Sequence, residues 1–282
     1  MLSNKKEEKK GMSADEIRAM REQERLDSVY PEPTAVHSGG RRIMPWLVVL
    51  GLTAVLLAAG MLLYDWLMKG LLYLDGFLSG VDFDRGLLTE SVFALLRSGV
   101  VLALALIIGH FLKIDMDGKC APFAEWGKSL RTWLIVALAA DVLFLLGSWL
   151  SGESIELTTT PGMYPIVYYI IKIFFVPLEN VVLFAAVPSQ IIGHIAPFVF
   201  DSKKKSELPL MISSTVILAV AQLGMSWEGI VGADIVIIAY ALIQSAVCSV
   251  LYHRSGNVWV PTAVYSAVTV LYYLMSWLLS II

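Results

Sequence analysis

The sequence predicts an all-α protein that crosses a membrane several times. Of its 282 residues, 57% are hydrophobic and only 16% are charged, and the mean hydropathy is +0.71. A soluble domain has too little interior to hide so much apolar surface. Several apolar stretches also reach the roughly 20 residues that a helix needs to cross a hydrocarbon core about 30 Å thick. We therefore expect a polytopic membrane helix bundle of about seven transmembrane helices, with room for an eighth.

The predicted spans are apolar runs separated by short polar loops. They cover residues 44–68, 91–112, 130–150, 161 to about 184, 208–227, 233–252 and 258–281. The stretch 161–200 is too long for one crossing, because about 40 helical residues extend about 60 Å, roughly twice the thickness of the hydrocarbon core. We expect this helix to kink, break or leave the core near Pro177 and Pro188, since proline removes a helical hydrogen bond and clashes with the preceding turn.

The chain divides into three parts by composition. Residues 1–43 form a charged tail, which we expect to be cytoplasmic and mostly mobile, with a short helix over 14–28 that Ser13 and Glu16 would cap. Residues 44–160 hold three transmembrane helices, and residues 161–282 hold the remaining four. The first apolar run begins too late for a cleavable signal peptide. Cys120 and Cys248 are predicted to be reduced thiols.

The loops between the predicted spans alternate between basic and acidic. The basic set consists of Arg41, Arg42, Lys113, Lys119, Lys128, Arg131, Lys203, Lys204, Lys205, His253 and Arg254. The acidic set consists of Asp75, Asp82, Asp84, Glu90, Glu153, Glu156 and Glu228, accompanied by Lys69 and Arg85. Because basic loops stay on the cytoplasmic side, we expect a cytoplasmic N-terminus and, with seven spans, an external C-terminus.

Four ionisable residues in or at the ends of the predicted spans are candidates for function, since a charge at membrane depth is costly. Asp234 begins a helix, where a carboxylate caps free N–H groups. Asp141 lies in the middle of a span and is either a buried hydrogen-bonded carboxyl or a transport or regulatory site. Lys172 and Glu179 are seven residues apart and share a helix face if Pro177 leaves the register intact; they form either a structural ion pair or a site.

Hydroxyl and other polar side chains recur at helical spacing in the last two spans. The stripe on the last span consists of Thr262, Tyr265, Thr269, Tyr272, Ser276 and Ser280, and that on the preceding span of Tyr240, Gln244, Cys248 and Tyr252. Such faces turn away from lipid. They indicate either helix packing through hydroxyl groups or a polar pocket.

The turn between the last two spans has a distinctive set of residues: Leu251, Tyr252, Arg254, Ser255, Gly256, Val258, Trp259 and Pro261. This set resembles the pattern lylrtGslwapilaHxxxN, which belongs to the closing helices of the CPBP family, the CAAX-protease and bacteriocin-processing membrane endopeptidases. The catalytic positions depart from the pattern: Tyr265 stands in place of the His, and Thr269 in place of the Asn.

The segment VPLENVVLF is similar to the P-x-EE-xx-FRG signature of the same family. Pro177 and Glu179 match, and the resemblance implies that Glu179 occupies the position of the water-activating general base. Asn180 replaces the second Glu, Leu183 the Phe, and Phe184 the Arg.

A second family motif, FxxxH, corresponds to the segment VILAVAQLG, with Leu218 at the Phe and Gln222 at the His. An amide cannot take up and return a proton as an imidazole does, and loss of a single oxyanion donor lowers catalysis by about 100- to 1000-fold. Glu179, Gln222, Tyr265 and Thr269 therefore form a degenerate version of the catalytic set, with Lys172, Asn180 and Asp141 as candidate binding residues.

Three interpretations of function follow. In the first, a pseudoprotease scaffold or regulator of the bacterial cytoplasmic membrane uses a cavity open to the cytoplasmic side to hold a partner membrane protein or peptide. The second is an active intramembrane endopeptidase with Glu179 as general base. The third is a small-molecule carrier or binding protein built around Asp141, Lys172 and Glu179. No metal, cofactor or nucleic-acid partner is predicted.

Overall fold

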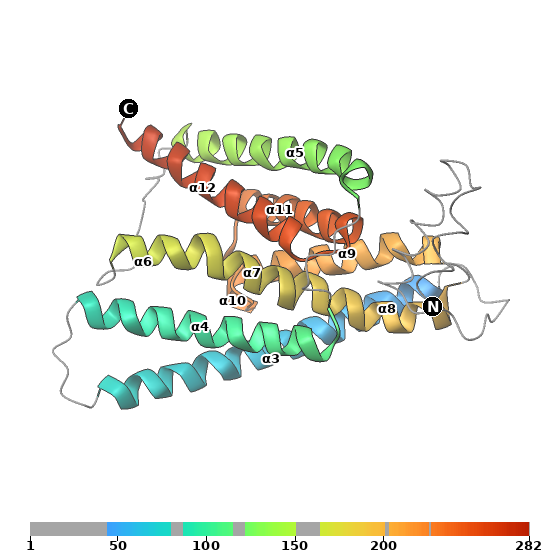
Figure 1. Cartoon of the computed structure of the whole chain (residues 1–282), viewed down its shortest axis with the longest axis horizontal. Coiled ribbons are helices and arrows are strands. Elements are labelled where there is room, and N and C mark those ends of the chain that lie inside the picture. Colours follow the sequence, from blue (N-terminus) through green and yellow to red (C-terminus); the bar gives the residue numbers. More distant parts are fainter. Residues whose placement is uncertain are drawn as a thin grey trace, which may run out of the picture.

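The computed structural model describes residues 44–79, 87–114, 122–150, 164–200, 203–225 and 227–281, and these residues form helices and no strand. The predicted tail over 1–43 with its short helix lies outside the described residues, as do most of the loops used for the orientation and Cys120. The described helices lie side by side along one direction, as Figure 1 shows. The expected all-α polytopic bundle is confirmed.

Six helices in the described ranges are long and apolar enough to cross a membrane. They are α3 (Met44–Ser79), α4 (Leu87–Phe111), α5 (Phe123–Leu150), the run from α6 to α8, α11 (Ile235–Ser255) and α12 (Trp259–Ile281). The predicted fifth span, 208–227, corresponds to the shorter helix α9 (Lys203–Gln222), whose apolar part is Ser206–Gln222. This helix begins inside the lysine-rich loop and ends before Trp227, where the short helix α10 (Trp227–Gly232) starts.

The helix with two internal prolines does not break. It runs from α6 (Pro165–Ile170) through a π-helical segment η2 (Ile171–Phe175), α7 (Val176–Asn180) and a second π segment η3 (Val181–Ala186) to α8 (Val187–Val199). The predicted end near residue 184 is therefore wrong.

The positions of the π segments explain why the helix continues. Pro177 and Pro188 are each the second residue after the end of a π segment. A proline ring clashes with the carbonyl four residues earlier, and a π segment shifts hydrogen bonding to the residue five positions away. The strain that was expected to end the helix is thus absorbed by two wide turns. The intact run extends about 50 Å, and α8 packs against α3 and α9 through Ile192 and Ala196.

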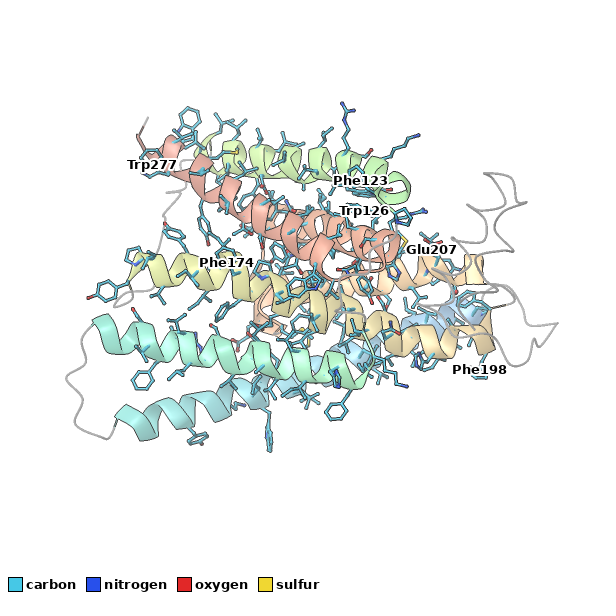
Figure 2. All side chains as sticks on the ribbon, in the orientation of Figure 1. Phe123, Trp126, Phe174, Phe198, Glu207 and Trp277 are labelled. Atoms are coloured by element: carbon cyan, nitrogen blue, oxygen red, sulfur yellow. The ribbon has the colours of Figure 1, made fainter. Side chains whose placement is uncertain are left out.

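The bundle has two distinct ends. We call the end that holds the α11–α12 turn and the starts of α3, α5 and α9 the turn end, and the opposite end, with the starts of α4 and α6 and the end of α12, the far end (Figure 1). Figure 2 labels Trp126 at the turn end and Trp277 at the far end. Exposed aromatic side chains near both ends of the apolar helices are typical of the two interfaces of a membrane.

The turn end contains the hairpin that the sequence predicts between the last two spans. Gly256 ends α11 with φ 67, a left-handed conformation that glycine adopts without strain. The Asn257 Oδ1 then accepts a hydrogen bond of 2.6 Å from the backbone N–H of Trp259 at the start of α12. The end of α11 and the start of α12 are therefore both defined by residues of this short turn.

Two other helix ends differ from simple expectation. Asp234 is the N-cap residue of α11, but its side chain makes no capping hydrogen bond, so the predicted cap is wrong. Helix α9 ends in a Schellman turn, in which Met225 N–H bonds to Val220 O and Gly224 N–H to Ala221 O. The buried Met225 side chain then reaches α3, where a Cβ added to Gly60 would overlap its Cε.

Candidate binding cavity

A cavity of about 950 Å³ lies among the helices. Its lining comes from α3, α4, α5, the α6–α7 run, α9, α11 and α12. Most of the lining residues belong to the far half of the bundle: Lys172 lies in the first half of the α6–α8 run, Phe144 in the second half of α5, and Tyr272 in the second half of α12. The cavity thus lies nearer the end opposite the basic α11–α12 turn.

The structure brings to this cavity the four residues that the sequence resemblance places at catalytic positions. Glu179 and Gln222 line it from α7 and α9, and Tyr265 and Thr269 line it from α12. The Gln222 Nε2 is buried and has no hydrogen-bond partner within the described part of the chain. The Thr269 hydroxyl donates to the carbonyl of Tyr265 at 2.9 Å, so its proton is used within its own helix.

Beneath Glu179, the residues that replace family side chains are packed into the protein. Asn180 is 8% exposed and donates from Nδ2 to the Tyr265 hydroxyl at 3.4 Å. Phe184, at the position of the family Arg, is buried in an apolar cluster with Leu218 and Cys248, against which Tyr265 packs. The floor of the cavity therefore has amide and phenol groups where the family pattern has a carboxylate and an imidazole.

Lys172 and Glu179 share the cavity but do not form an ion pair. Both side chains line it, and no carboxylate in the described chain lies within 4.0 Å of the Lys172 ammonium. The Lys172 Nζ instead lies over the ring of Tyr168, 5.8 Å from its centroid. Lys172 is exposed to the cavity, and the structural ion pair considered from the sequence is absent.

Arg97 is a cavity residue that the sequence analysis missed. It belongs to the second span and lines the cavity from α4. An arginine in the middle of an apolar helix costs about 2.5 to 3.5 kcal/mol on insertion scales. The signal was present in the sequence as an arginine within the predicted span 91–112.

The structure identifies the hydrogen-bond partners of Asp141, which the sequence could not. The carboxyl is completely buried, and its Oδ1 accepts hydrogen bonds from the Tyr240 hydroxyl at 2.7 Å and from the Gln244 Nε2 at 2.9 Å. Asp141 does not itself line the cavity, but both of its partners do. It therefore ties α5 to α11 behind the cavity wall and holds two lining side chains in place.

An aromatic wall covers the far part of the cavity. Tyr168, Tyr272 and Tyr273 line it, and Tyr273 meets Tyr168 edge to face with ring centroids 6.3 Å apart. Phe144 stacks on Tyr240 at 4.7 Å. From the predicted stripe on the last span, Tyr265, Thr269 and Tyr272 face the cavity, while the hydroxyl groups of Thr262 and Ser276 bond to their own helix backbone.

The polar groups that line the cavity are one carboxylate, two cations and several neutral hydrogen-bond donors. Among the described residues that line it, Glu179 is the carboxylate, Lys172 and Arg97 are the cations, and no histidine is present. No group of three or more potential metal ligands was found in the described part of the chain. The arrangement is suited to holding a ligand through charge and hydrogen bonds.

Comparison with known proteins adds no relative to this picture. No family model matches the sequence, no curated protein matches it, and no solved structure matches the fold. The resemblance to the CPBP family consequently depends on the residues of its motifs alone.

Proposed function

We propose that this protein is a multi-pass membrane protein that binds a small or amphipathic ligand in the cavity between its helices. The observation that carries the proposal is the cavity itself: about 950 Å³, lined by Glu179, Lys172 and Arg97 together with tyrosine and amide side chains. Pockets that enclose small ligands measure about 300 to 1000 Å³ and combine apolar walls with a few placed polar groups. The cavity has this size and this composition.

The size of the cavity favours a small ligand over a protein partner. A stable interface with another protein buries about 1200 to 2000 Å² of surface, which a cavity of about 950 Å³ between helices does not offer. A scaffold or regulator of the bacterial membrane that holds a partner membrane protein would need a surface of a different kind. A headgroup, a metabolite or the end of one peptide fits a cavity of this volume.

The CPBP-like residues support a binding role more than turnover. Peptide hydrolysis needs a general base beside a water molecule, a group that returns the proton, and donors for the oxyanion. Glu179 supplies a base, but Gln222 and Thr269 supply an amide and a hydroxyl that bonds within its own helix. We therefore regard the protein as catalytically degenerate in its CPBP-like part.

The proposal is tested by measuring the mass of the protein with its bound ligand, and by introducing a bulky side chain that occupies the cavity. In native mass spectrometry of protein purified in mild detergent, we expect a bound species of defined mass. Ala94→Trp, which inserts an indole into the cavity from α4, should abolish it. Ala103→Trp is the matched control, because Ala103 is exposed on the same helix and does not line the cavity. A species that survives Ala94→Trp, or no bound species in the unmodified protein, would contradict the proposal.

A second candidate, an active intramembrane endopeptidase, has one observation in its favour: all four residues at the family catalytic positions line the same cavity. It predicts cleavage of a membrane-anchored reporter peptide that is abolished by Glu179→Gln. Glu228→Gln is the matched control, because Glu228 is an exposed carboxylate of α10 outside the cavity. Cleavage that depends on Glu179 and not on Glu228 would replace the binding proposal with the enzymatic one.

A further inference from the structure

Arg97 and Lys172 lie at nearly the same depth on neighbouring helices. The backbone N–H of Tyr164, which precedes α6, donates to the Ser91 Oγ of α4 at 2.9 Å, and this bond places the two residues side by side. Both helices run from the far end toward the turn end and pack along one another (Figure 1). At 1.5 Å per residue, Arg97 lies about 9 Å and Lys172 about 12 Å beyond this shared level. The two cations therefore face one region of the cavity.

The deeper part of the cavity carries the opposite charge. Glu179 follows Tyr164 by 15 residues, so it lies about 22 Å beyond the shared level, roughly 10 Å deeper than the cations. No carboxylate of the described chain lies within 4.0 Å of the Arg97 guanidinium or the Lys172 ammonium. The outer part of the cavity thus has two cations that form no direct ion pair with a described carboxylate, and Glu179 interacts with the Lys172 charge only over a longer distance.

The groups around these cations add donors for oxygen atoms. Tyr168 lies beneath the Lys172 ammonium, and Tyr272 and Tyr273 line the cavity from α12. Phenol groups donate hydrogen bonds to anionic oxygens, a guanidinium binds two oxygens at once, and an ammonium binds as a point charge. This set of donors is larger than a single carboxylate can use, and it matches the several oxygens of a phosphate.

Resting on the binding function proposed above, we propose that the far part of the cavity binds a phosphate group through Arg97 and Lys172. The phosphate is that of a phospholipid headgroup or of a free phosphate ion, since the recognised chemistry is the same. The ligand enters with its anion toward the far end, and the rest of it extends toward the Tyr265 floor or out between the helices. A cationic ligand is disfavoured in this region by repulsion from both side chains.

The test uses calorimetric titration of the full chain in neutral detergent. The probes are dihexanoyl phosphatidate, inorganic phosphate, and dihexanoylglycerol, which has the same acyl chains without the phosphate. We expect saturable binding of the phosphatidate with one molecule per chain. Arg97→Gln and Lys172→Gln should each weaken this binding by about 10-fold or more, because each removes a charge-assisted contact.

Two further variants distinguish a loss of phosphate recognition from a general disruption of the fold. Arg97→Lys keeps the charge and should retain most of the binding. Lys69→Gln is the matched control, because Lys69 is exposed, pairs with Asp65 at 2.6 Å, and does not line the cavity; its binding should equal that of the unmodified protein. If inorganic phosphate competes with phosphatidate, the ion alone is recognised, and if it does not, the phosphate is recognised as part of a lipid.

The inference is overturned if dihexanoylglycerol binds as tightly as the phosphatidate, or if both glutamine variants bind like the unmodified protein. In either case the native mass spectrum still reports whether the cavity holds any ligand. A bound species that is sensitive to Ala94→Trp but not to Arg97→Gln would leave the binding function intact and reject the phosphate alone. The absence of any bound species would reject the binding function itself.

Discussion

Asn180 and Tyr265 meet at the floor of the cavity, where the Asn180 Nδ2 donates to the Tyr265 phenol oxygen over 3.4 Å. The two residues are 85 positions apart in the chain and come from α7 and α12. In the resemblance to the CPBP pattern, these two residues stand where that pattern has its second Glu and its His. A neutral amide and a neutral phenol hold the two helices together but do not transfer a proton between them as a carboxylate and an imidazole can.

Removing the phenol oxygen should remove this hydrogen bond and lower the stability of the protein, while the cavity is kept. Tyr265→Phe leaves the Asn180 amide without its acceptor, so we expect a loss of about 1 kcal/mol in the free energy of unfolding. Thermal unfolding in detergent measures it, with Tyr73→Phe as the control, because Tyr73 is 81% exposed. Equal stability of the two variants would mean that the long Asn180–Tyr265 contact does not contribute.

At position 141, loss of the hydrogen-bond acceptor should lower the stability of the protein more than loss of the negative charge. Asp141→Leu leaves the Tyr240 hydroxyl and the Gln244 amide without an acceptor in a buried site, and we expect a loss of about 2 to 4 kcal/mol. Asp141→Asn retains an oxygen that can accept both bonds and should cost less than half as much. Measurements of the free energy of unfolding for the two variants test this difference. If Asp141→Asn preserved stability but abolished uptake of a substrate into liposomes, Asp141 would belong to a carrier mechanism instead.

The contact between α3 and the end of α9 should be intolerant of a side chain at Gly60. Gly60→Leu would overlap Met225, and overpacking of this kind costs about 1 to 3 kcal/mol. Gly51→Leu is the matched control on the same helix, since a Cβ there meets nothing within 4 Å. The double variant Gly60→Leu with Met225→Ala should recover part of the loss. Purely additive effects in this double-mutant cycle would show that the two residues do not interact.

The orientation of the bundle is tested by reporters at the two ends of the chain. By the positive-inside rule, alkaline phosphatase fused after Ile282 should be active in intact cells, and a fluorescent protein fused before Met1 should fluoresce in the cytoplasm. An inactive C-terminal phosphatase would reverse the orientation and place the far end of the bundle on the cytoplasmic side.

The helices could be predicted from the sequence because their signal is local. Runs of apolar residues indicate each transmembrane helix, and the pattern around Gly256 predicts the turn between the last two helices. The fate of the helix at Pro177 and Pro188 could not be predicted, since a π segment depends on hydrogen bonds that leave no compositional trace. The early end of α9 depends on the left-handed Gly224 and Met225, which apolar composition does not reveal.

The cavity was predicted in part. The motifs pointed to Glu179, Gln222, Tyr265 and Thr269, and the structure brings all four to one cavity. The partners of Asp141 lie 99 and 103 residues away, so no local pattern could have identified them. The motifs identify the residues of the cavity floor, but they do not identify the aromatic wall or Arg97 above it.

The most direct test of the account is whether water-soluble reagents reach the cavity from the far end of the bundle. With Cys120→Ser as background and Cys248 buried, Thr269→Cys is treated with a charged, membrane-impermeant thiol reagent on either face of sealed membranes. The account predicts labelling from the far face only, suppressed by Ala94→Trp, and none at Leu274→Cys, because Leu274 is exposed on the outer surface of α12 and does not line the cavity. Labelling of Thr269→Cys from the turn face alone, or from neither face, would contradict it.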